Sequence, residues 1–153
     1  MKYWLMKSEP SVFGIDHLAK CVNQTEPWDG VRNYQARNMM RDEMKPGDSV
    51  FFYHSNCDVP GIVGLMEIVS EGYADFTAFD PQHRYFDPKS DADNPRWFLV
   101  DVKLKRKFGD TIPLSFLREQ TALKDMKILQ RGSRLSITPV TKKEWDFILT
   151  LAC

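Results

Sequence analysis

The chain has 153 residues, of which 42% are apolar, 27% charged and 12% aromatic, and its formal net charge is zero. These values are typical of a soluble globular protein with one hydrophobic core, so we expect a single domain over residues 1–153. Zero net charge argues against binding of polyanions through overall basicity, and three widely spaced cysteines argue against a disulfide framework or a zinc site.

The first third of the chain predicts one strand and two helices. Residues 3–6, YWLM, indicate a strand that Pro10 stops, and residues 14–22 carry apolar side chains at helical spacing. Asn33 can cap a second helix, in which an alanine and three methionines share one face before KPGD at 45–48 ends it. The N-terminus does not resemble a signal peptide, and no apolar run reaches the ~18 residues of a membrane span. We therefore expect a cytoplasmic protein, or a nuclear one in a eukaryote, with no membrane partner.

The middle of the chain predicts a hairpin followed by a long loop. Residues 49–55 and 61–69 are rich in β-branched and aromatic residues, and residues 56–61 between them suit a hairpin loop. Residues 73–95 contain three prolines and five aspartates, which predicts a long loop. Loops of this length in compact domains are usually functional or disordered, and the aromatic residues of this one argue against disorder.

The last third predicts a long strand, a short helix, another strand and a final helix. In residues 96–108, Phe98, Val100, Val102, Leu104 and Phe108 are expected on one face and three lysines on the other. A short helix is predicted at 112–119 and a strand at 133–140. Thr141 and Glu144 then form a capping box at the start of a helix over 141–151. Separate runs of strands with short helices favour a small, mostly antiparallel, barrel-like sheet.

No enzyme motif is present in the sequence. The glycines form no GxGxxG, phosphate loop or GxSxG pattern, and the three histidines are scattered. His54 and Ser55 are neighbours in a predicted strand, so their side chains point to opposite faces and make a poor catalytic pair. We therefore expect no catalytic residues, no metal and no cofactor.

Charges and tryptophans suggest where a ligand could bind. Residues 96–107 carry a net charge of about +4, residues 124–134 about +3 and residues 66–93 about −5, counting Lys and Arg against Asp and Glu. These zones are either solvated surface or a basic strip for phosphates beside an acidic loop. Trp4, Trp97 and Trp145 fit the core. Trp28 fits neither the helical nor the strand spacing of apolar residues. It therefore either fills the core or offers an aromatic plane beside a helix N-terminus.

Five strings, in this order, resemble the EVE domain over nearly the whole chain. They are YWLMKSEP, WDGVRNYQARN, FFYHSNCDVPGIVGLMEIV, YFDPKSDADNPRWFLVDV and RLSITPVTKKEWDFIL. The resemblance implies a fold of the α+β class, a PUA-like small, mostly antiparallel β-barrel with peripheral short helices. It also implies a non-enzymatic reader that flips a modified base of DNA, or of RNA, into an aromatic-walled pocket, with a cytosine derivative favoured.

The resemblance also implies site residues, because the YTH readers of the same PUA-like group begin with a strand ending in Lys-Ser and use a tryptophan as one wall. Tyr85 and Phe86 are candidates for the second wall, where this chain has no tryptophan. The expected pocket is formed by Lys7, Ser8, Trp28, Asp29, Val31, Asn33, His54, Ser55, Asn56, Tyr85, Phe86, Asp87 and Pro88. The expected phosphate contacts are Arg32, Arg37, Lys103, Lys105 and Lys107.

The expected partner is a nucleic acid that carries a modified base, with a separate nuclease or modification-system protein as a further partner and a monomer as the oligomeric state. Two alternatives remain open at this point. One is an enzyme that acts on a modified nucleobase or nucleotide, with His54, Ser55 or Asp87 in acid–base roles. The other is an interaction module that binds a small metabolite in the same cleft.

Overall fold

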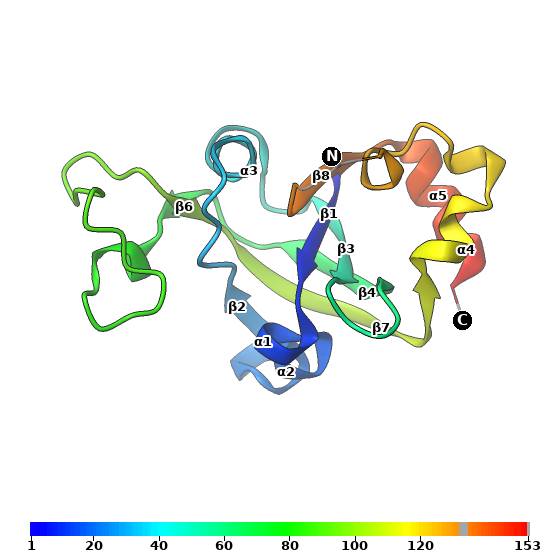
Figure 1. The fold of residues 1–153 in the computed structure, drawn as a ribbon, viewed down its shortest axis with the longest axis horizontal. Helices are drawn as coiled ribbons and strands as arrows, with labels where there is room; N and C mark the ends of the chain where they lie inside the picture. The colour runs from blue at the N-terminus through cyan, green and yellow to red at the C-terminus, as the bar shows by residue number, and fades with distance from the viewer. Residues whose placement is uncertain (132–134, 153) are drawn as a thin grey trace.

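The computed structural model describes residues 1–131 and 135–152. Its centre is a curled six-stranded sheet with the strand order β2-β7-β4-β3-β1-β8 (Figure 1). The strands are β1 (Tyr3–Ser8), β2 (Thr25–Pro27), β3 (Ser49–His54), β4 (Gly61–Ile68), β7 (Asp101–Pro113) and β8 (Ile137–Val140). Only β1 and β3 pair in parallel among these described strands, and the other four pairings are antiparallel.

Both faces of the sheet are buried, because neighbouring residues of a strand point to opposite faces. In β1, Trp4 and Met6 join one hydrophobic cluster and Leu5 joins the other. In β3, Phe52 belongs to the first cluster and Phe51 to the second. This double burial explains why β3 is a nearly continuous apolar run.

Short helices cover the two faces (Figure 1). The first cluster includes residues of α2 (Ile15–Lys20) and α3 (Tyr34–Asn38), and α1 (Pro10–Phe13) packs against it through Phe13. The second includes residues of α4 (Leu114–Arg118) and α5 (Lys142–Leu151). One π-helical turn, Met39–Glu43, continues α3, and 3₁₀ turns lie at Val22–Gln24, Phe76–Phe79, Thr121–Leu123 and Lys127–Leu129.

Two of the predicted helix starts have the predicted caps. The Asn33 side chain accepts a hydrogen bond from the backbone N–H of Ala36 at 3.0 Å. Thr141 and Glu144 form both bonds of the capping box at the start of α5. None of the helices in the described part of the chain has the length and apolar character needed to span a bilayer.

Residues 73–95 form a long, mostly irregular segment, as predicted, with short regular elements that the prediction did not contain. The segment contains β5 (Tyr73–Ala74), which pairs with β6 (Phe98–Leu99), and a 3₁₀ turn, Phe76–Phe79, in which the side chain of Asp75 accepts a hydrogen bond from the N–H of Thr77. Trp97 is buried as expected but lies just before β6 rather than inside a strand. The carboxylate of Asp87 accepts a hydrogen bond from Trp97 Nε1 at 2.6 Å.

The predicted strand at 96–108 is also different in detail, because it is split at Val100 and bulged further along. Against β4, Leu104 pairs with Met66 but Arg106 pairs with Leu65, so the register shifts by one residue. A bulge of this kind moves every later side chain to the other face. Val102 consequently belongs to the first cluster and Phe108 to the second, so the prediction that they share a face was wrong.

The α+β class with a small, mostly antiparallel curled sheet and peripheral short helices is confirmed. The sheet forms a half-barrel, because the end strands β2 and β8 are not paired with each other within residues 1–131 and 135–152. The predicted strand at 133–140 corresponds to β8, and residues 133 and 134 lie outside the described residues.

Candidate nucleic-acid interface

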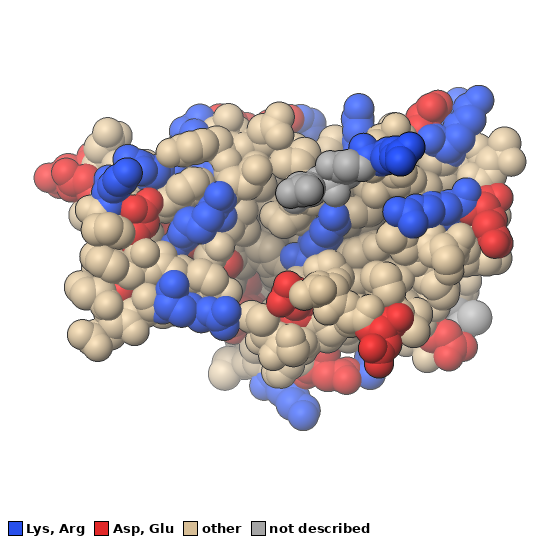
Figure 2. Space-filling model, in the orientation of Figure 1, with Lys and Arg blue, Asp and Glu red and all other residues tan. Residues whose placement is uncertain are grey.

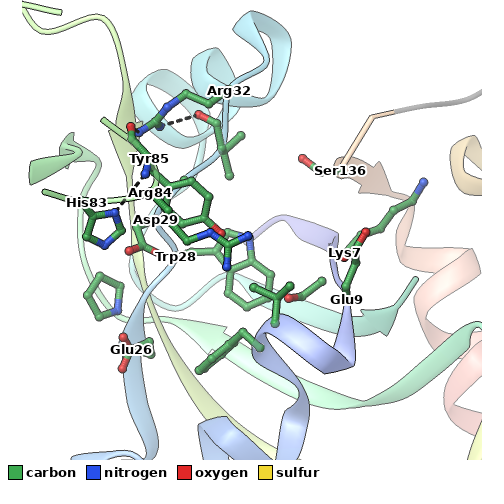
Figure 3. A pocket seen from close by; sticks show the side chains of 16 residues that line it. Lys7, Glu9, Glu26, Trp28, Asp29, Arg32, His83, Arg84, Tyr85 and Ser136 are labelled. Atoms are coloured by element: carbon green, nitrogen blue, oxygen red, sulfur yellow. Dashed lines mark hydrogen bonds between the residues drawn. The ribbon is translucent and has the colours of Figure 1, made fainter. Parts of the chain in front are cut away.

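A cavity of about 490 Å³ opens between three parts of the chain that are far apart in the sequence (Figure 3). These parts are the end of β1 with α1, the segment from β2 to residue 32, and residues 83–85, and Ser136 completes the lining. In Figure 3, Tyr85 and Arg84 stand on one side, Lys7, Glu9 and Ser136 on the other. The volume lies within the 300–1,000 Å³ range of typical ligand pockets.

Trp28 lines the cavity but also belongs to the hydrophobic core. It directly follows β2, and its backbone N–H donates to the carbonyl of Val100 at 2.9 Å. The indole packs edge-on against Phe52 and Phe13, with ring centroids 5.4 and 6.1 Å apart. Only 7% of the residue is exposed, so Trp28 fills the core, which is one of its two expected roles, and its contact with a base stays a prediction.

Tyr85 provides an aromatic wall from the β5–β6 segment. Its ring lies against Gly30, where a side-chain Cβ would come within 2.4 Å of the ring atom Cε2. Gly30 also has a φ of +78°, which side chains other than glycine rarely adopt. The glycine of the WDG string therefore permits both the local turn and the close approach of the tyrosine ring.

Arg32 and Asp75 connect these two walls inside the protein. Arg32 donates from Nη1 to Asp75 Oδ2 at 3.0 Å and from Nη2 to the backbone carbonyl of Tyr85 at 2.5 Å. Asp75 is fully buried and also accepts hydrogen bonds from Gly30 and Thr77. Burial opposes ionisation of Asp75, but the hydrogen bonds from Thr77, Gly30 and Arg32 hold its pKa below the usual value.

The remaining polar groups of the lining are of mixed charge. Half-burial lowers the pKa of Lys7. Burial, followed by repulsion from Asp75, raises the pKa of Asp29, which lies beside His83 in Figure 3. Figure 2 shows Lys and Arg side chains on both sides of a hollow in the middle of this face. The cavity thus combines aromatic surface with a partly cationic rim.

The family model of the EVE domain matches residues 2–151. The chain belongs to the EVE family. Thymocyte nuclear protein 1 of Danio rerio is 50% identical over 165 residues, which cover 97% of this chain and 71% of that protein. This EVE chain also superimposes on solved structures of close relatives.

Two of these structures represent a eukaryotic and a bacterial relative. The human THYN1 protein, solved in complex with 5-methylcytosine containing DNA, is 47% identical with a TM-score of 0.91, covering 99% of this chain and 97% of that one. Protein PSPTO5229 from Pseudomonas syringae is 45% identical with a TM-score of 0.92, covering 97% and 98%.

Seven of the expected pocket and phosphate residues line the cavity of this EVE chain. They are Lys7, Ser8, Trp28, Asp29, Val31, Arg32 and Tyr85. The other expected pocket residues lie outside the lining. They are Asn33, His54, Ser55, Asn56, Phe86, Asp87 and Pro88.

Several of the residues outside the lining form hydrogen bonds that stabilise the fold. Asn33 caps α3, and His54 accepts a hydrogen bond from the backbone N–H of Ile15 at 3.1 Å. Ser55 donates its backbone N–H to the carbonyl of Ser8, and Asn56 donates to Glu9 at 3.0 Å. Ser55 and Asn56 therefore contact the segment that carries Ser8 and Glu9, two residues of the lining.

Most of the expected phosphate contacts already have partners. Arg37 donates to the carbonyl of Arg96 at 2.8 Å and to Asn38. Lys105 and Lys107 form ion pairs with Glu67 and Asp16, at 3.9 and 2.6 Å. The three lysines do not share a strand face, because the bulge in β7 lies between Lys103 and Lys107.

Sequence reasoning missed much of the lining. The missed residues are Glu9, Val12, Phe13, Glu26, Pro27, Gly30, His83, Arg84 and Ser136. A Pro at the first position of a helix was an available signal for α1, which carries Val12 and Phe13. For Arg84 and His83, no local pattern places them in the same cavity as Trp28, since that proximity depends on the path of the β5–β6 segment.

Proposed function

We propose that residues 1–153 act as one EVE domain that binds a modified base in DNA, with a cytosine derivative favoured. The base leaves the duplex and enters the cavity beside Trp28 and Tyr85. The observation that carries this proposal is a cavity of about 490 Å³ with aromatic walls, in a chain 47% identical to a human protein solved with 5-methylcytosine containing DNA.

The energetics of this binding mode set what the cavity must provide. Extrusion of a base from a duplex costs a few kcal/mol, and stacking of a base on an aromatic side chain returns ~1–3 kcal/mol. The free energy of stacking is no larger than the free energy that extrusion of the base costs. Net binding therefore requires further contacts, to the flanking phosphates. Ser8 and Asp29 provide hydrogen-bonding groups in the lining for the edge of the base, with Asp29 accepting from an exocyclic amino group.

Lys7 and Arg84 are the best-placed phosphate contacts. Both line the cavity, and neither is part of an ion pair among residues 1–131 and 135–152. The Arg84 guanidinium lies over the Tyr85 ring, 5.1 Å from its centroid. A cation in this position holds the phosphate next to a base that stacks in the cavity.

We propose a reader and not an enzyme. His83 is the histidine of the lining, and its Nδ1 accepts the backbone N–H of Tyr85 at 3.1 Å. The hydroxyls of Ser8, Ser136 and Tyr85 in the lining form no hydrogen bond with this imidazole in the described part of the chain. A nucleophile needs a base within hydrogen-bonding reach, and this pairing is not formed here.

The test is a titration of the protein against matched duplexes that contain cytosine, 5-methylcytosine or another modified cytosine at one position. Single-stranded DNA and RNA of the same sequence are included, and a fluorescent base analogue at the target position reports extrusion. We expect saturable binding that favours a modified duplex, an increase in fluorescence, and an unchanged oligonucleotide by mass spectrometry. Tyr85→Ala should reduce the preference, whereas Phe116→Ala, an exposed aromatic of α4, should not.

Equal affinity for modified and unmodified duplexes at every salt concentration would exclude a modified-base reader. A stronger preference for the RNA strand would mean that the cavity is the binding site but that its ligand is RNA and not DNA. A shortened or base-depleted product would instead identify an enzyme.

A further inference from the structure

We propose that Arg32 and Asp75 are positioning residues that hold the Tyr85 wall of the cavity in place, with Gly30 as the surface against which the ring rests. This inference rests on the proposed function, because it assigns the residues that give the base pocket its width. It also reassigns Arg32, which the sequence suggested as a phosphate contact.

The contacts of Arg32 point inward. Its Nη1 donates to the carbonyl of Val31 at 3.1 Å and to the carboxylate of Asp75 at 3.0 Å, and its Nη2 donates to the carbonyl of Tyr85. The guanidinium carbon also lies 5.4 Å from the centroid of Trp97 and 5.8 Å from that of Tyr85. A planar fork that bonds a carboxylate and a carbonyl together fixes the distance between them, which a lysine cannot do.

Asp75 fixes the other end of this connection. Its Oδ2 accepts from Arg32 and from the backbone N–H of Gly30, at 3.0 and 2.9 Å. Its Oδ1 accepts from the N–H and the hydroxyl of Thr77, at 2.9 and 2.5 Å. One fully buried carboxylate therefore ties the turn after Trp28 to the 3₁₀ turn that begins the Tyr85 segment.

The ring of Tyr85 is located by Gly30. A Cβ at position 30 would lie 2.4 to 2.6 Å from three atoms of the ring, a distance at which the ring must move. Arg32 thus holds the backbone of Tyr85 through its carbonyl. The missing side chain at Gly30 leaves the space that the ring of Tyr85 occupies. Both constraints act on the wall of the cavity that residues 83–85 provide.

A positioning role and a phosphate contact predict different results for Arg32→Met. If Arg32 positions Tyr85, the preference for a modified duplex over its unmodified match should fall by about 5- to 150-fold, the range that one base–aromatic stack is worth. The dependence of affinity on salt should not change. If Arg32 contacts phosphate, both duplexes should lose affinity alike and the salt slope should fall by ~1.

Arg32→Lys and Asp75→Asn extend this test, and Arg41→Met is the control because Arg41 pairs with Asp42 on the surface. Arg32→Lys keeps the charge but loses the fork, so a positioning role predicts reduced selectivity at an unchanged salt slope. Thermal melting gives the stability of every variant. Binding is then measured at a temperature where each variant is fully folded. A Lys variant with wild-type selectivity would overturn the proposal.

Gly30→Ala tests the same wall from the opposite side. Gly47→Ala is its matched control, because Gly47 has a φ of +97° but a Cβ there would have no atom within 4 Å. Both substitutions carry the backbone strain, and only Gly30→Ala displaces the ring. We expect Gly30→Ala to reduce selectivity by a similar factor to Arg32→Met, and Gly47→Ala to leave it unchanged.

Hydrogen exchange of the unliganded protein separates this proposal from the proposed function. Arg32→Met should accelerate exchange at residues 83–87, which include the N–H groups of Tyr85, Phe86 and Asp87 that are bonded to neighbouring groups. Arg41→Met should not. Unchanged exchange in Arg32→Met would refute the positioning role even if the protein binds modified DNA, and accelerated exchange would support it even if the ligand is different.

Discussion

Replacement of Trp28 by alanine should destabilise the protein strongly, and this effect must be separated from any effect on binding. The residue is 7% exposed and packs against Phe52 and Phe13 in the first cluster. Truncation of a buried tryptophan or phenylalanine to alanine typically costs about 3–5 kcal/mol. Domains of this size have a stability of roughly 5–15 kcal/mol, so the loss is a large fraction of the total. For a domain of about 150 residues it corresponds to a fall in Tm of roughly 6–20 °C.

Trp28→Phe keeps an apolar ring in the core and is the better test of binding. Urea unfolding gives the stability of each variant, and a titration of the same sample, at a temperature where it is folded, gives the affinity. Stacking of a base on the indole is worth ~1–3 kcal/mol, or about 5- to 150-fold in Kd. We expect folded Trp28→Phe to lose part of this factor.

Two results would refute this reasoning about Trp28. If Trp28→Ala melts like the wild type, the indole does not contribute to the core. If folded Trp28→Phe and folded Trp28→Ala both bind the modified duplex as the wild type does, the indole does not stack on the base.

Three further predictions concern charge. Arg84→Met should weaken binding to modified and unmodified duplexes alike and reduce the salt slope by ~1; an unchanged slope would place the phosphate elsewhere. Lys105→Met should leave the slope unchanged, because Lys105 pairs with Glu67 outside the lining. Burial lowers the pKa of His54, whose Nε2 accepts from Ile15, so its contribution to stability is present above about pH 6.5 and is lost as the pH falls through the lower folded value. Thermal melts between about pH 7.5 and 5 should therefore show a decline that His54→Gln flattens, and an equal decline in both proteins would contradict this origin.

The parts of the fold that follow from local patterns were predictable. The helix caps at Asn33 and Thr141 and the β3–β4 hairpin depend on residues within a few positions of each other, and all three are present. The α+β class with a small, mostly antiparallel, barrel-like sheet followed from the order of these elements together with the EVE strings. The end of β1 brings Lys7 and Ser8 into the lining of the cavity, and their contact with a base stays a prediction.

The bulge in β7 was not predictable from the alternation of residues 96–108. Lysines at 103, 105 and 107 alternate with apolar or basic residues, so the sequence alone suggests one uninterrupted pleat. The pairing with β4 decides otherwise, since Leu65 pairs with Arg106 and Met66 with Leu104. Such a shift depends on the partner strand, which local periodicity does not contain. For this reason the expected lysine face, and its role as a phosphate strip, could not be tested before the strands were paired.

The cations near the cavity illustrate why position along the chain does not determine function. Arg32 lies one residue before the cap of α3, where phosphates are favoured, and on that basis alone it is the stronger candidate for a phosphate contact. Its partner Asp75 is 43 residues away and belongs to a zone that the sequence marks only as acidic. Once that carboxylate is buried, it requires a cation beside it, because an unpaired buried charge is far more costly than a lost surface contact. Arg84 forms no ion pair with a carboxylate in the described structure, and it is exposed at the rim of the cavity. Which of the two arginines contacts phosphate therefore depends on which one the fold leaves without an ion pair. The salt dependence of affinity in Arg32→Met and in Arg84→Met tests this assignment directly.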